Sequence, residues 1–324
     1  MASIAGTKRQ TITFVFPEHA SVHNRLNGGR LMDWIMQTAT INSSLISKGI
    51  TVLGATDSID FINPVMVGDI VTLVSWVEYI GSSSMELGVE AFSENPETGD
   101  KELTTSSHLA FVAVDEDGKP RKISEKITPA NSEEMTIYME AKKRKEDRLA
   151  QVEKRDNQAK NVIDETEIVR DRLETTKVVL PEDTFHGDFM AVGKLIRDID
   201  QAASILAMRY VKGVMITASL DDLYFYTPIR IGDIITFKAG ITYVGQSSLE
   251  IGIKVLSENV LTGEQHHTCT AFLSFVHIDE HGNTVPVPEF DPETPQEKRL
   301  WKKAQERKNF RAERVKQLKD SNEY

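Results

Sequence analysis

The sequence predicts an α+β fold made of two copies of one unit, each an antiparallel sheet packed on a single long helix. One observation is an internal repeat with a constant offset of 164 residues, which matches Pro64 to Pro228 and Gly81 to Gly245. The other is that each copy contains one long amphipathic segment followed by several segments rich in β-branched and aromatic residues. A gapless series of such matches indicates a tandem duplication.

In each half a glycine turn opens the long helix, at Gly28-Gly29 in the first half and at Gly193 in the second. Apolar residues then recur at spacings of three and four, which places them on one helix face: Leu31, Trp34, Ile35 and Thr38, and later Leu195, Ile199, Ala202 and Leu206. The two copies differ seven residues after the second glycine. Met36 stands in the first helix where Asp200 stands in the second.

The first helix is expected to end near Ser47, and the expected strands of the first half are residues 10–16, 51–61, 69–80, 84–93 and 101–114. A charged segment follows each sheet, at residues 132–160 and 297–318. Because Glu alternates there with Lys and Arg, we interpret these segments as solvated surface helices. The predicted organisation is a domain at 10–125, a charged helical linker at 126–174, a second domain at 175–290, and a charged C-terminal helix at 291–324.

Composition narrows the class of protein. The chain has 324 residues, enough for two domains, and 40% hydrophobic with 27% charged residues is typical of a globular protein. A net charge of −11 argues against general nucleic-acid binding. The single cysteine, Cys269, rules out an intrachain disulfide and fits a reducing compartment. With no apolar run long enough for a membrane span and no secretory signal, a cytoplasmic location is expected.

The chain resembles the hotdog-fold acyl-CoA thioesterases. The resemblance rests on the glycine-initiated helices, on the duplication, and on segments such as 257–263 and 285–288. The tandem form, similar to the cytosolic long-chain acyl-CoA hydrolases of animals, matches nearly the whole chain. This resemblance implies two hotdog domains, each a sheet wrapped around its helix. It also implies hydrolysis of acyl-CoA to free fatty acid and CoA, with no cofactor beyond the CoA of the substrate. Assembly into a homotrimer of double-hotdog chains is implied as well.

In that family an Asp seven residues after the glycine pair of one unit faces an Asn in the mouth loop of the other unit. The resemblance assigns this Asp to Asp200, but Ser21 occupies the Asn position, and Asn24 in the same loop is an alternative source of the amide. In the other combination Met36 faces Phe185, so no chemistry is left there. One active site per chain is therefore expected, between Asp200 and the loop containing Ser21 and Asn24 with the glycines Gly28 and Gly29.

The chemistry of these residues fits thioester hydrolysis. A carboxylate such as Asp200 acts as a general base or as a nucleophile, and backbone N–H groups near Gly28 and Gly29 polarise the thioester carbonyl. The alternative for Asp200 is a buried structural acid, and the alternative for Asn24 is a residue that only forms a turn. Asp33, one turn from the key position, is expected to face solvent.

Four basic residues are candidates for holding the CoA phosphates: Arg25, Arg30, Lys194 and Arg209. The His residues show no spacing that suggests a metal site, and none is expected. The alternative function is a non-catalytic acyl-CoA-binding or scaffolding hotdog protein, which the loss of the family Asn supports and the retention of Asp200 opposes. A hotdog hydratase is a weaker alternative, because the Asp and His of that pattern are not found in one loop.

Overall fold

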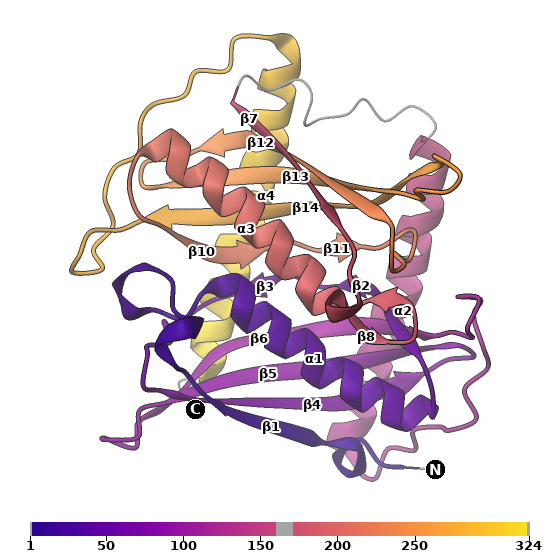
Figure 1. Cartoon of the computed structure of the whole chain (residues 1–324). Helices are drawn as coiled ribbons and strands as arrows, with labels where there is room; N and C mark the ends of the chain where they lie inside the picture. Colours follow the sequence, from indigo (N-terminus) through magenta and orange to yellow (C-terminus); the bar gives the residue numbers. More distant parts are fainter. Residues whose placement is uncertain (1, 160–170, 323–324) are drawn as a thin grey trace.

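The computed structural model of the chain describes residues 2–159 and 171–322. Two units of the same plan lie one above the other in Figure 1, each with a long helix across one face of a sheet. The lower unit contains α1 (Gly28–Ser47), and the upper unit contains α3 (Val192–Val211). The arrangement confirms the α+β fold class, with two helices and two antiparallel sheets forming a double-layered pseudo-dimer.

The strands repeat in the same order in both units. The first unit contains β1 (Arg9–Phe14), β2 (Thr51–Thr56), β3 (Ile59–Asp60), β4 (Ile70–Ile80), β5 (Ser84–Glu94) and β6 (Lys101–Ala113). The second contains β7 (Arg172–Val178), β10 (Met215–Leu220), β11 (Leu223–Tyr224), β12 (Ile234–Val244), β13 (Ser248–Glu258) and β14 (Gln265–His277). A small hairpin, β8 (Thr184–His186) with β9 (Phe189–Met190), precedes α3. Short 3-10 turns are formed by Ala5–Thr7, Pro17–His19, Val22–Asn24 and Pro181–Asp183.

The two units exchange short strands. The strand predicted at 51–61 is divided into β2 and β3, because β3 leaves its own unit and pairs with β10 in the other sheet. In the same way β11 pairs with β2. The residue pairs are Ile59 with Leu220 and Thr56 with Leu223, which the 164-residue repeat converts into each other. The duplication therefore acts in space as a pseudo-twofold axis.

The helices α1 and α3 pack against each other at the centre of the molecule. Gly29 lies beside Asp200 and Gly193 lies beside Asp33, so the two helices run in opposite directions. A Cβ atom at Gly29 would stand 2.8 Å from Oδ2 of Asp200, so the close crossing requires glycine there. Among the described helices, none combines the length and the apolar composition that crossing a membrane would need.

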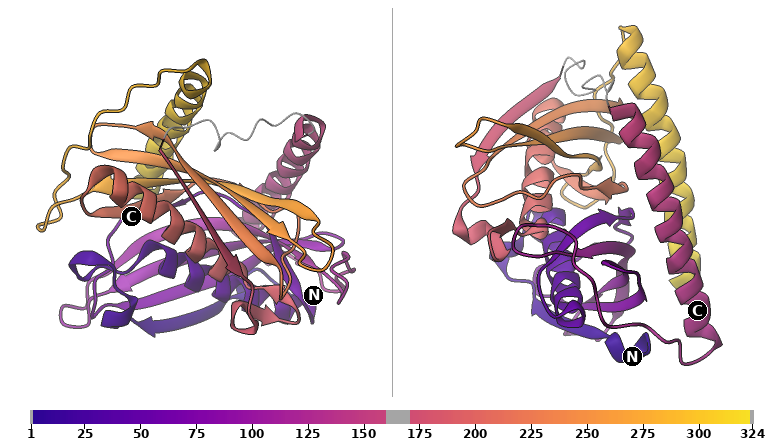
Figure 2. Two further views of the ribbon diagram at one scale, coloured as in Figure 1. Left: turned by 45° about the horizontal axis from the view of Figure 1, so that its top comes forward. Right: turned by 90° about the vertical axis from the view of Figure 1, so that its right-hand side faces the viewer.

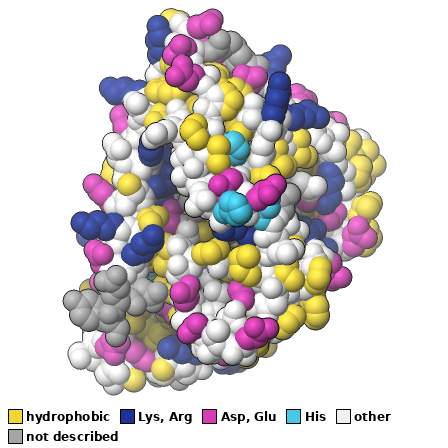
Figure 3. Space-filling view, turned by 90° about the vertical axis from the view of Figure 1, so that its left-hand side faces the viewer, with side chains coloured by type: hydrophobic (Ala, Val, Ile, Leu, Met, Phe, Trp, Pro, Cys, Tyr) yellow, Lys and Arg dark blue, Asp and Glu magenta, His cyan; other side chains and the backbone are white. Residues whose placement is uncertain are grey.

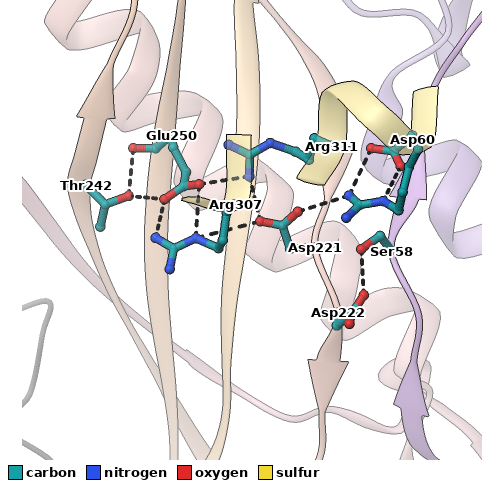
Figure 4. Close-up of polar contacts among 9 residues, drawn as sticks. Ser58, Asp60, Asp221, Asp222, Thr242, Glu250, Arg307 and Arg311 are labelled. Atoms are coloured by element: carbon teal, nitrogen blue, oxygen red, sulfur yellow. Dashed lines mark hydrogen bonds and ion pairs between the residues drawn. The ribbon is translucent and has the colours of Figure 1, made fainter. Parts of the chain in front are cut away.

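Two charged helices, α2 (Ser132–Ala159) and α4 (Pro295–Asn322), both run along the outer side of the sheets, opposite the side that α1 and α3 cover (Figure 2, right). Their interpretation as purely solvated helices is wrong, because Arg148 and Arg311 are buried beneath them. Arg148 Nη1 lies 2.6 Å from Oε2 of Glu86, and Arg311 Nη1 lies 2.8 Å from Oε2 of Glu250. Figure 4 shows the second of these clusters. Residues 160–170 of the predicted linker lie outside the described residues.

Candidate active site

The carboxylate of Asp200 lies at the boundary between the two units. Its side chain leaves the middle of α3 and is 1% exposed. Oδ2 accepts a hydrogen bond of 3.1 Å from the backbone N–H of Gly29, at the start of α1 in the other unit. Oδ1 accepts a 2.7 Å hydrogen bond from the hydroxyl of Thr217. The structure thus brings an acid of one unit to the helix mouth of the other.

Thr217 is a member of this site that sequence reasoning missed. It lies in β10 at a β-bulge, where the pairing with β14 shifts register between Thr217 and Ser219. The repeat held one signal for it, since the equivalent residue of the first unit is Leu53, which cannot donate a hydrogen bond. A Cβ atom at Gly28 would stand 2.7 Å from Cβ of Thr217, so the first glycine of the pair makes room for this side chain.

Burial raises the pKa of Asp200 to about 6, because a charged carboxylate loses its hydration inside the protein. The hydrogen bonds from Thr217 and Gly29 favour the charged form and offset part of this rise in pKa. A carboxyl group with a pKa in this range is ionised at neutral pH and still basic enough to take a proton. The environment of Asp200 therefore suits a general base.

The glycine pair stands at the N-terminus of α1, where unpaired N–H groups and the helix dipole favour negative charge. The side chain of Asn27 caps this helix by accepting a 2.9 Å hydrogen bond from the N–H of Arg30. The Gly29 N–H donates to Asp200. Gly29 thus lies against the carboxylate of Asp200 and Gly28 lies against Thr217, so the positive end of the α1 dipole faces this pair of side chains.

The mouth loop before α1 is unusual in its backbone. His23 has φ +59° and Asn24 has φ +56°, a left-handed conformation that is costly for residues other than glycine and is concentrated at functional sites. The hydroxyl of Ser21 donates a 3.1 Å hydrogen bond to the carbonyl of Arg25, and the Asn24 side chain is exposed. Within residues 2–159 and 171–322, neither side chain hydrogen-bonds to Asp200.

The pseudo-equivalent position has lost both polar groups. Met36 and Leu53, both buried, stand where the other site has Asp200 and Thr217. Asp33, expected at the surface, is instead 1% exposed, because the crossing of α1 and α3 covers it. Its Oδ2 lies 3.6 Å from Nη1 of Arg197, so this acid is held in an ion pair between the helices.

The candidate CoA-binding cations are spread over both units. The guanidinium of Arg25 lies against the turn at Gly282 of the opposite unit, and Arg30 lies in the first turn of α1. The ammonium of Lys194 donates to the carbonyl of Glu182, and Arg209 is exposed in the last turn of α3. On the face in Figure 3, the basic and acidic side chains of the described residues are interspersed. Among those residues, no group of three or more His, Cys, Asp or Glu is placed to hold a metal ion.

Fold and site together define a class of protein, a duplicated α+β chain with a carboxylate at the interface of its halves. The family model described as the thioesterase superfamily matches residues 23–99 and 193–264. A Bacillus subtilis protein named as an uncharacterized acyl-CoA thioester hydrolase is 40% identical over 139 residues, covering 43% of this chain and 81% of that protein. The chain belongs to the thioesterase superfamily.

Similarity also extends over most of the chain. The human cytosolic acyl coenzyme A thioester hydrolase is 26% identical over 308 residues, which cover 90% of this chain and 80% of that protein. A solved structure of an acyl-ACP thioesterase from Bacteroides thetaiotaomicron aligns with a TM-score of 0.53 over 84% of this chain and 99% of its own. Its 13% sequence identity makes this a similarity of fold.

Proposed function

We propose that this chain is an acyl-CoA thioester hydrolase that releases free fatty acid and CoA at one active site per chain. The observation that carries the proposal is the buried Asp200 carboxylate, hydrogen-bonded across the unit interface to Gly29. Its pKa of about 6 keeps it ionised at neutral pH. Two relatives named as acyl-CoA thioester hydrolases support the same activity. One is similar over 90% of this chain and the other over 43%.

In the proposed mechanism the thioester carbonyl lies at the N-terminus of α1, beside Gly28 and Gly29. Asp200 removes a proton from a water molecule, whose oxygen attacks the carbonyl carbon while the oxyanion is stabilised by the positive end of the helix. The carbon–sulfur bond then breaks, and the proton held by Asp200 passes to the departing CoA sulfur. Thr217 orients the carboxylate through its 2.7 Å hydrogen bond. Direct attack by Asp200 is the alternative, which would form an anhydride.

The test is release of free thiol from a panel of acyl-CoAs by the wild-type protein and by Asp200→Asn. We expect the variant to lose about 10²- to 10⁴-fold in kcat, the usual contribution of a general base. Asp198→Asn is the matched control, since Asp198 lies on the same helix but pairs with Lys177 outside the site. Ser21→Ala and Asn24→Ala, made separately, identify which of them orients the reacting group. An unchanged rate for Asp200→Asn would refute the proposal.

The alternative function is a non-catalytic acyl-CoA-binding or scaffolding protein. Ser21 at the position of the family Asn supports this alternative, as does the engagement of its hydroxyl with the Arg25 carbonyl. The same assay separates the two functions. If wild type and Asp200→Asn both bind an acyl-CoA and neither releases thiol from any member of the panel, the binding function replaces the catalytic one.

We also propose a homotrimer of double-hotdog chains, a cytoplasmic location, and no cofactor beyond the CoA of the substrate. Support for assembly comes from the edge strand β1, which together with the residues after it exposes Ile12, Phe14 and Phe16. Exposed edges with apolar side chains are usually covered. Light scattering at micromolar concentration tests the assembly, and a mass of 36.3 kDa would contradict it. The domain boundaries at 10–125 and 175–290 and the four phosphate-binding cations remain predictions.

A further inference from the structure

The pseudo-equivalent of the active site contains a cavity of about 210 Å³. It lies between the start of α3 and the sheet of the first unit. Its walls come from both units and include Leu53 and Gly54 of β2, Phe111 of β6, Phe189, Leu195 of α3, and Phe225. Phe185, which is 46% exposed, lies among the lining residues toward the surface. The cavity therefore opens beside Leu53 and Gly193 of the half-site that lacks the catalytic acid.

The repeat places this cavity where the other site would receive its substrate. Gly193, which lines the cavity, corresponds to Gly29, and Leu53 corresponds to Thr217. Phe225 corresponds to Phe61, whose ring would lie 3.3 Å from a Cβ atom at Gly28. The architecture of an acyl site is thus preserved on this side of the pseudo-twofold axis.

The chemistry of the cavity selects an apolar ligand. None of the residues that line it is charged, and its polar side chains, such as Gln37, Thr40 and Thr268, are neutral. A cavity of roughly 150 Å³ with aliphatic and aromatic walls stays dry and binds benzene in another protein. A space of about 210 Å³ therefore accepts a similar or somewhat larger apolar group, which fits several methylenes of an alkyl chain.

We propose that this cavity is a second, non-catalytic acyl site that binds the aliphatic chain of a fatty acyl group without cleaving its thioester. No carboxylate is available for the chemical step, since Met36 replaces the acid and Leu53 the hydroxyl donor. The inference rests on the proposed function only for the identity of the ligand, because the substrate or the product supplies the chain. Acyl-CoA and free fatty acid share this chain and are separated by the test.

The test is isothermal titration calorimetry of decanoyl-CoA into the Asp200→Asn protein, in which turnover is blocked. We expect two molecules bound per chain. Adding Phe185→Asp places a charge at the mouth of the cavity, and should remove one binding event or weaken it by about tenfold or more. Adding Gly54→Val places a larger side chain in the wall of the cavity and should weaken the same binding event. The backbone tolerates it, because a Cβ atom at Gly54 would meet its nearest neighbours at 3.4 and 3.5 Å, an ordinary contact distance. A parallel titration with decanoate shows whether the free acid also enters.

The matched control is Phe310→Asp, which changes an equally large and 64% exposed side chain on α4, outside the cavity. It should bind two molecules like its parent. Binding in the parent that neither cavity substitution weakens would overturn the inference, whether one or two molecules are bound per chain. Because the measurement is binding to a protein that does not turn over, its outcome does not depend on the thiol-release assay.

Discussion

Replacing Asp200 by Asn is expected to remove the proposed base and also a loss of stability that wild type suffers as the pH rises. In the folded protein Asp200 is fully buried and its pKa is about 6, whereas an unfolded Asp titrates near 3.9. The folded state therefore holds a proton more tightly than the unfolded state. The contribution of protonated Asp200 to the free energy of unfolding is fully present below about pH 4. It is lost as the pH rises through about 6.

The size of the effect follows from the difference in pKa. A difference of roughly two units, at 1.36 kcal/mol per unit, corresponds to about 3 kcal/mol of destabilisation once the group is ionised. About 2 kcal/mol of this is lost between pH 4.5 and pH 8. Asn keeps the volume and both contacts, because its oxygen accepts from the Gly29 N–H and the Thr217 hydroxyl can rotate to accept from its amide.

Urea unfolding at pH 4.5 and at pH 8 measures the prediction. The stability difference between Asp200→Asn and wild type should grow in favour of the variant by about 2 kcal/mol at the higher pH. Leu261→Asn, a change at a 94% exposed residue without a titrating group, is the control and should change the stability by the same amount at both pH values. If the difference between Asp200→Asn and wild type is the same at both pH values, Asp200 does not carry a raised pKa and the argument for a buried base fails.

Three further outcomes are expected. Thr217→Val removes the hydrogen bond to the charged form of Asp200, so the acidic limb of the pH–kcat profile should move to higher pH and kcat should fall. Arg311→Ala removes one cationic partner from each of two buried carboxylates, while Arg307 still pairs with Glu250 and Arg314 with Asp221, and should cost about 1.5–3 kcal/mol in urea unfolding, unlike the exposed Lys316→Ala. Met36→Ala creates a core cavity costing about 2–5 kcal/mol, yet thiol release should persist below the lowered melting temperature.

The parts of the fold and site that sequence reasoning found are those encoded by local pattern and by the repeat. The apolar spacing after Gly29 and Gly193 predicted α1 and α3, and both helices begin where the glycines indicated. Comparison of equivalent positions singled out Asp200 because Met36 stands opposite it in the alignment of halves. The structure places that carboxylate against the predicted glycine.

What sequence reasoning missed depends on partners far apart in the chain. Arg148 and Glu86 are 62 residues apart, so the charge pattern of α2 alone gives no sign that its arginines turn inward. Asp33 looked like a surface residue because its burial comes from the crossing helix α3 and not from its own neighbours. Thr217 is one of two β-branched residues in β10, and only the fold shows that its hydroxyl donates to Asp200.

The proposed active site exists only while the two units keep their relative position. The outer helix α4 contributes to holding that position. On one side α1 and α3 fix the distance between Gly29 and Asp200. On the other side, Arg314 of α4 lies 2.9 Å from Asp60 of the first unit.

The same side also contains a contact on the pseudo-twofold axis, where Ser58 donates a 2.6 Å hydrogen bond to Asp222, its own equivalent in the repeat (Figure 4). The charges of Asp60 and Arg314 are costly to remove from water, and apolar packing of the same volume would often be as stable. Their directional pairing instead specifies one register between the units. The interfacial site requires this register, because Gly29 and Asp200 belong to different units.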